Sequence, residues 1–109
     1  MTNHLNAFFS ALSDPTRRAV VERLIEGPAS VSELHDPHDI ALPTFLRHLK
    51  VLEDAGLVAS EKSGRVRTVH IEAARLIEAE HWLARQRRLW EGRLDRLDAL
   101  AEQLNDQKL

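Results

Sequence analysis

The chain has 109 residues, the length of one ordinary domain, and its 43% hydrophobic and 29% charged residues are typical of a folded globular protein. The absence of cysteine excludes disulfides, thiolate metal sites and thiol nucleophiles, and no apolar run reaches the roughly 18 residues of a membrane span. Because Met1–His4 also lacks a secretory-signal pattern, we expect a cytoplasmic protein. The net charge is −2, yet residues 42–70 carry five basic and three acidic side chains.

The first two predicted elements are helices separated by a proline break. Apolar side chains recur at helical spacing over residues 3–12. Asp14 is a favourable N-cap and Pro15 suits the first helical position, so a second helix is expected to begin here. This helix should end at Gly27, because glycine is common just beyond a helix C-terminus.

A short helix and a longer one follow. Ser30 with Glu33 three residues later matches a capping box, and the third helix should end near Pro37. Residues 38–41 are long enough only for a turn. The fourth helix is predicted from residue 42 to Gly56, with a buried apolar stripe along one side.

Two strands and a long helix complete the chain. Residues 57–62 and 65–71 are predicted to be strands joined across residues 63–64, and a helix should run from 73 to 105. The order α-α-α-α-β-β-α predicts a mainly α fold with a two-stranded β wing, a winged helix-turn-helix, as one domain over residues 1–109. A small α+β domain with no DNA role is the alternative interpretation of the same order.

The fourth helix is the first element that indicates DNA binding. Its outward face carries Thr44, Arg47 and His48 in the first two turns, the part of a recognition helix that contacts bases. Arginine can pair with both acceptors of guanine, and threonine offers a hydroxyl and a methyl group. Lys50 lies further round the helix and suits a phosphate. A merely solvated helix face is the alternative.

The hairpin is the second such element. Lys62, Arg65 and Arg67 cluster at its tip, and strand alternation predicts that the two arginines share one face. Gly64 allows the backbone to turn there. Arginines at such a tip suit a minor groove or phosphates, although charges on an edge strand also favour solubility. The predicted DNA contacts are Thr44, Phe45, Arg47, His48, Lys50, Lys62, Ser63, Arg65 and Arg67.

Three stretches resemble the ArsR family of bacterial winged-helix repressors: residues 12–18 (LSDPTRR), residues 31–34 (VSEL) and residues 47–58 (RHLKVLEDAGLV). The last is the most specific, because helix, helix end and strand entry match together. The resemblance implies a homodimer that occupies an operator and leaves it when an effector binds. It also implies that the outward residues of the fourth helix contact bases and that the wing contacts the DNA backbone.

The last helix carries an apolar stripe in which Leu76, Leu83, Trp90, Leu97 and Leu104 recur every seven residues. One small domain has too little surface to cover so long a helix, so the stripe indicates a partner. The alternative is a helix folded back on its own domain. The resemblance implies that the helices at 3–12 and 73–105 form a dimer interface. The predicted interface residues are Leu5, Phe8, Phe9, Leu12, Leu83, Trp90, Leu94, Leu97 and Leu104.

Six histidines raise the question of a metal, since many members of the resembling family sense metals. No cofactor is expected to be required. If Ni²⁺ or Zn²⁺ binds, the expected ligands are His35 and His38, with His4 from the first helix, because neutral imidazole suits both ions. A polar loop explains the first two histidines without a metal. His70 and His81 match only half of the family's other, interhelical ligand pattern.

The sequence therefore predicts a transcriptional repressor that binds operator DNA as a homodimer, tuned by a metal ion or small effector if it senses one. The alternative is a winged-helix module that docks on a protein. An enzyme is not expected, because the sequence has no Gly-rich phosphate loop, no HExxH motif and no convincing Ser-His-Asp order.

Overall fold

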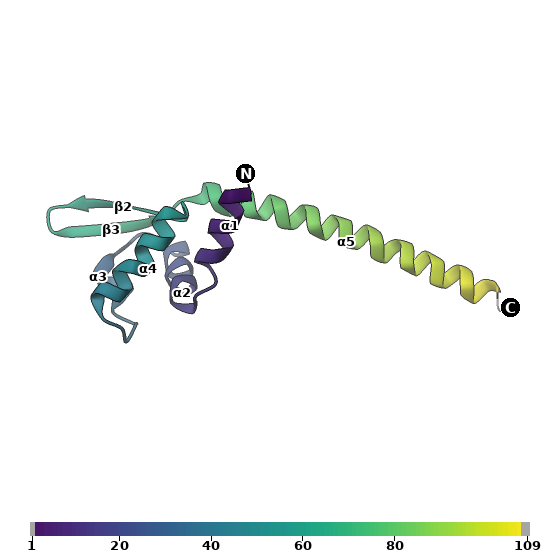
Figure 1. Cartoon of the computed structure of the whole chain (residues 1–109), viewed down its shortest axis with the longest axis horizontal. Helices are drawn as coiled ribbons and strands as arrows, with labels where there is room; N and C mark the ends of the chain where they lie inside the picture. Colours follow the sequence, from purple (N-terminus) through teal and green to yellow (C-terminus); the bar gives the residue numbers. More distant parts are fainter. Residues whose placement is uncertain (1, 108–109) are drawn as a thin grey trace. The chain divides into compact units, whose positions relative to one another are not determined.

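The computed structural model describes residues 2–107, and Figure 1 shows the order of their helices and strands. The elements are α1 (Thr2–Ala11), α2 (Pro15–Ile25), β1 (Ala29–Ser30), α3 (Val31–His35), α4 (Leu42–Asp54), β2 (Val58–Ser63), β3 (Val66–Ile71) and α5 (Ala73–Gln107). Every predicted helix and strand is present, and the mainly α winged helix-turn-helix is confirmed. The chain divides between Glu78 and Ala79 into two compact units.

Two helices begin as the local sequence predicts. The Asp14 side chain accepts a hydrogen bond of 3.1 Å from the backbone N–H of Arg17 and thereby caps α2. At α3 the Ser30 hydroxyl accepts from the Glu33 N–H, and the Glu33 carboxylate accepts from the Ser30 N–H. This reciprocal pair is a capping box, so it satisfies two backbone donors at the start of a five-residue helix.

The end of α4 is a Schellman motif built on glycine. Gly56 has a φ of +76°, its N–H donates to the Glu53 carbonyl, and the Leu57 N–H donates to the Leu52 carbonyl. Leu57 is fully buried directly after this turn. The motif therefore ends the helix and directs the chain at once into β2.

The sheet has three strands rather than the two predicted. The strand order is β1-β3-β2, with both neighbouring pairs antiparallel, and the two-residue strand β1 places Ala29 opposite Val69. A strand this short has no alternation for a sequence pattern to reveal. The hairpin turn is Gly64–Arg65, one residue later than predicted, because Ser63 still pairs with Val66.

The core of the first unit lies between α2, α4 and the sheet. Its largest fully buried side chains are Phe45, Leu52, Leu57, Val20 and Val69. Since Phe45 and Leu52 both come from α4, the core holds one side of this helix and leaves the opposite side exposed. Figure 1 shows the hairpin of β2 and β3 next to α3 and α4.

Residues 79–107 of α5 form the second unit, and a row of large apolar side chains on it is exposed. Exposed fractions lie between 51% and 61% for Leu83, Trp90, Leu94, Leu97 and Leu104. No helix within residues 2–107 is long and apolar enough to cross a membrane.

Candidate nucleic-acid interface

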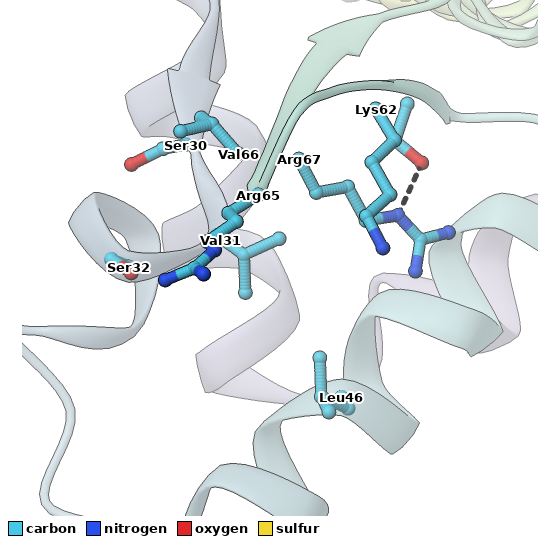
Figure 2. Close-up of a pocket in the computed structure, with 9 residues that line it drawn as sticks. Ser30, Val31, Ser32, Leu46, Lys62, Arg65, Val66 and Arg67 are labelled. Carbon is cyan, nitrogen blue, oxygen red and sulfur yellow. Dashed lines mark hydrogen bonds between the residues drawn. The ribbon is translucent and has the colours of Figure 1, made fainter.

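A groove of about 750 Å³ runs between the wing, the start of α3 and the outward side of α4 (Figure 2). It is lined by Ser30, Val31, Ser32, Leu46, Ser60, Lys62, Arg65, Val66 and Arg67. The lining thus combines three cationic side chains with small hydroxyl groups and a few apolar ones. Such a concave, positively charged surface suits an anionic backbone with bases behind it.

The exposed side of α4 carries Arg47, which forms no hydrogen bond or ion pair with any other described residue and is therefore available to a ligand. Thr44 is half-buried on the preceding turn. The prediction that Phe45 contacts DNA is wrong. Its side chain is 0% exposed, because it lies on the apolar stripe of α4 and packs into the core.

His48 is half-buried and already has partners. A guanidinium N–H of Arg17 lies 3.0 Å from His48 Nδ1, and an Asp14 carboxylate oxygen lies 3.8 Å from the same nitrogen. Because arginine can only donate, the hydrogen bond assigns the acceptor role to Nδ1 and the donor role to Nε2. His48 therefore keeps one donor, Nε2–H, for a base or phosphate acceptor.

The same Arg17 side chain links α2 to the end of α1. Its Nε donates to the Ala11 carbonyl at 2.7 Å, and a terminal nitrogen donates to the Ser10 carbonyl at 3.3 Å. Burial raises the pKa of Asp14, but the backbone hydrogen bonds from Arg17 and Thr16 and the positive charge of Arg17 outweigh it, so this pKa is lowered overall. Asp14 is thus held as a carboxylate beside the recognition helix.

Lys50 is exposed but not free. Its ammonium lies 2.9 Å from the Asp54 carboxylate one helical turn later, and this hydrogen bond raises the pKa of Lys50. Both side chains are largely in solvent, where such a pair contributes little to stability. Lys50 can therefore exchange Asp54 for a DNA phosphate at small cost.

The wing separates its three basic residues into two kinds. Lys62 and Arg65 form no ion pair or hydrogen bond within residues 2–107, and the adjacent Ser63 is exposed. Arg67, in contrast, donates through Nε to Ser60 Oγ at 2.8 Å, drawn as the dashed line in Figure 2, and through Nη2 to Glu53 at 3.0 Å. Of the four predicted wing contacts, Lys62, Ser63 and Arg65 are therefore accessible to a ligand, and Arg67 is engaged within the chain.

The histidines proposed as metal ligands are not brought together. Within residues 2–107 no group of three or more His, Asp or Glu side chains is placed to hold a metal ion. His35 Nε2 lies 2.7 Å from the Ile40 carbonyl, and the rings of His35 and His38 pack against Phe45. His4 instead lies 3.6 Å from Glu78. These residues do not fit a Ni²⁺ or Zn²⁺ site, which needs three or four converging donors.

The residues predicted for a dimer interface also divide into two kinds. The prediction for Phe8 is wrong, because its ring is only 6% exposed and belongs to the core. Leu5 and Leu12 are half-buried, while Phe9 is exposed and its ring makes an edge contact with Phe8. The α5 members of the set, Leu83, Trp90, Leu94, Leu97 and Leu104, are all more than half exposed.

Three functional candidates that the folded chain reveals are absent from the residues predicted from the sequence: Arg17, Glu53 and Ser60. Arg17 and Glu53 lie inside two of the three stretches that resemble the family, which is a signal, but only the folded chain shows what they contact. Ser60 carried no signal, because a serine in a half-exposed strand is unremarkable.

An exposed recognition helix beside a basic wing defines a winged helix-turn-helix of the DNA-binding class. Comparison with known proteins supports the same class. A helix-turn-helix domain family matches residues 12–61. The crystal structure of an ArsR family transcriptional regulator is 53% identical, covers 84% of this chain and 94% of its own, and superposes with a TM-score of 0.80.

Two curated relatives extend this result. The HTH-type transcriptional regulator Rv2034 of Mycobacterium tuberculosis is 42% identical over 64 residues, 59% of this chain and 60% of its own length. The biofilm growth-associated repressor of Xylella fastidiosa is 32% identical over 80 residues, 71% of this chain and 70% of its own. The chain belongs to the ArsR family of helix-turn-helix transcriptional regulators. The proteins it matches are regulators rather than enzymes.

Proposed function

We propose that this protein is a transcriptional repressor that binds a specific operator sequence as a homodimer. The observation that carries the proposal is the groove between α4 and the wing, where the lining residues Lys62 and Arg65 have no partner within the described residues. Arg47, exposed on α4 but outside the groove lining, also has no partner among them. Unpaired cations beside the exposed side of a helix are suited to duplex DNA, because they can bind its phosphate backbone while the helix contacts base edges. The Xylella relative's name as a repressor supports the same output.

In the proposed complex α4 enters the major groove. Arg47 pairs with a guanine, Thr44 and His48 add a hydroxyl and an Nε2–H donor, and Lys50 contacts a phosphate. The wing residues Lys62, Ser63 and Arg65 contact the DNA backbone beside that groove. Arg67 is not included among these contacts, because it is hydrogen-bonded to Ser60 and Glu53. Blocking a promoter by occupying the operator is the proposed output.

The second copy is proposed to cover the exposed apolar row of α5, together with the exposed part of α1. A row of leucines and a tryptophan, each more than half exposed, is far larger than the scattered apolar residues of a monomer surface. A two-fold dimer presents two recognition helices about 34 Å apart, which is one turn of DNA. Since the ligand is chromosomal DNA, the proposed location is the cytoplasm.

The test is fluorescence anisotropy on a duplex selected by the protein from a random library, compared with a scrambled duplex. Selective binding that weakens steeply as salt rises supports the repressor. Equal binding to both duplexes, or none, refutes it and favours a protein-docking module, which need not show such a salt dependence. Size-exclusion chromatography with light scattering tests the dimer separately.

A further inference from the structure

Glu53, Ser60 and Arg67 form a closed triangle of hydrogen bonds, which we call the clasp. Ser60 Oγ donates to Glu53 Oε1 at 2.8 Å, Arg67 Nε donates to Ser60 Oγ at 2.8 Å, and Arg67 Nη2 donates to Glu53 Oε1 at 3.0 Å. The three residues come from α4, β2 and β3 respectively. The clasp therefore ties the last turn of the recognition helix to both strands of the wing.

The strand register explains why Ser60 and Arg67 meet. Lys62 is opposite Arg67 and Ser60 is opposite Val69, so all four project from one face of the hairpin. On that face Val69 is buried in the core, which orients the whole face toward α4. The Schellman turn at Gly56 brings β2 back past the end of α4 and so places Glu53 within reach.

The charges make the clasp stronger than an ordinary surface contact. Arg67 and Glu53 form a charge-assisted pair, and the Glu53 side chain is only 26% exposed. Two of the donor nitrogens of Arg67 are thereby engaged, whereas the neighbouring Lys62 and Arg65 have no partner in the described chain. Arg67 thus differs in role from the two cations beside it.

We infer that the clasp sets the angle of the wing relative to α4, and that Glu53 and Arg67 are positioning residues for DNA recognition rather than contacts. This inference rests on the proposed function. The expected change in DNA affinity is opposite to the one that charge alone predicts. Removing an acidic side chain near a phosphate-binding surface normally strengthens DNA binding by reducing repulsion, whereas removing Glu53 should weaken binding to the specific site.

The experiment compares Glu53→Ala with Glu61→Ala by anisotropy on the selected and scrambled duplexes. Glu61 is an exposed wing carboxylate with no partner among residues 2–107, so its removal changes the charge equally without touching the clasp. Glu61→Ala should leave binding unchanged or strengthen it on both duplexes. Glu53→Ala should weaken the selected duplex about three- to tenfold, the effect of losing one partly exposed charged hydrogen bond, without weakening the scrambled one.

Three further variants separate positioning from contact. Glu53→Gln keeps an oxygen acceptor for Ser60 and should restore part of the affinity. Arg67→Ala should lower specific affinity but leave the dependence on salt unchanged, because Arg67 neutralises no phosphate. The double variant Glu53→Ala/Arg67→Ala should be no weaker than the weaker single variant, since one interaction is lost in all three.

Amide hydrogen exchange of the free protein gives a readout that needs no DNA. Glu53→Ala should speed exchange along β2 and β3 relative to wild type and to Glu61→Ala. Unchanged exchange, or a Glu53→Ala variant that binds like Glu61→Ala, overturns the inference while the repressor stands. A wild-type protein without selective DNA binding overturns the proposed function, and the recognition role of the clasp with it.

Discussion

Arg65→Ala is expected to reduce the salt dependence of DNA binding by an amount that follows from the structure. Arg65 lies in the hairpin turn and, like Lys62, forms no ion pair within the described residues. Both are proposed to neutralise phosphates, so a dimer brings about four such contacts from its wings, and each contributes about −0.9 to the slope of log K against log salt. The wings then supply a slope of about −3.6, and the variant keeps about half of it.

In measurable terms, the wing contribution should cost wild type about a hundredfold in affinity between 50 and 200 mM salt, and the Arg65→Ala variant only about tenfold. The assay is anisotropy over that salt range on the selected duplex. The scrambled duplex should show the same loss of slope, since phosphates carry no sequence. Arg87→Ala is the control, because Arg87 lies on α5, outside the groove, and is paired with Glu91 at 3.7 Å.

The result that refutes this reasoning is an unchanged slope for Arg65→Ala, or an equal reduction for Arg87→Ala. The first outcome means that the wing tip does not contact the backbone. The second means that the slope reports total charge rather than a contact. Either would leave Lys62 and Arg65 as solubilising charges at the tip of the hairpin.

Four other changes test separate parts of the structure. Arg47→Ala should cost about 1–3 kcal/mol on the selected duplex and relax its base preference, measured by competition with single-base variants; normal binding would remove Arg47 from the base contacts. Leu97→Asp should convert the dimer into a monomer by light scattering and abolish tight DNA binding, and a dimer that persists would place the interface elsewhere. Phe45→Ala should cost about 3–5 kcal/mol in urea unfolding, because the ring is fully buried; a loss below 1 kcal/mol would contradict the packing. Asp14→Ala should lose about 1 kcal/mol through its N-cap. Since folding lowers the pKa of Asp14, that difference is present above its ordinary value of 3.8 and disappears as pH falls through the lower folded value; a difference that is constant with pH would contradict this.

The elements that the sequence predicts well are those with a local cause. The cap at Asp14, the capping box at Ser30 and the glycine end of α4 each depend on residues within five positions of one another, so the printed sequence contains all that is needed. The strand β1 lacks such a cause. It exists because β3 offers it an edge, and two residues carry no period of their own.

The roles of the wing arginines show where local reasoning stops. Alternation predicts that Arg65 and Arg67 share a face, but the turn falls at Gly64–Arg65, so Arg65 leaves the strand and Arg67 alone takes part in the ladder. A shift of one residue in the turn thus decides which arginine is free for a ligand and which is held by Glu53 and Ser60. Because both have the same chemistry, only the register distinguishes them.

The clasp and the apolar row of α5 differ in what the sequence reveals about them. The contacts of the clasp cannot be predicted from the sequence, whereas the row can be predicted but its partner cannot. In the clasp, three polar residues at intervals of seven find one another because a glycine turn and a strand register place them together. On α5, the regular apolar spacing is visible in the sequence, yet Leu83, Trp90, Leu97 and Leu104 of the second unit are each more than half exposed. The apolar spacing therefore indicates a surface that another molecule covers. A second copy is the proposed partner for this row, and it would double the number of recognition helices, so the oligomeric state and the DNA affinity should be lost together in Leu97→Asp.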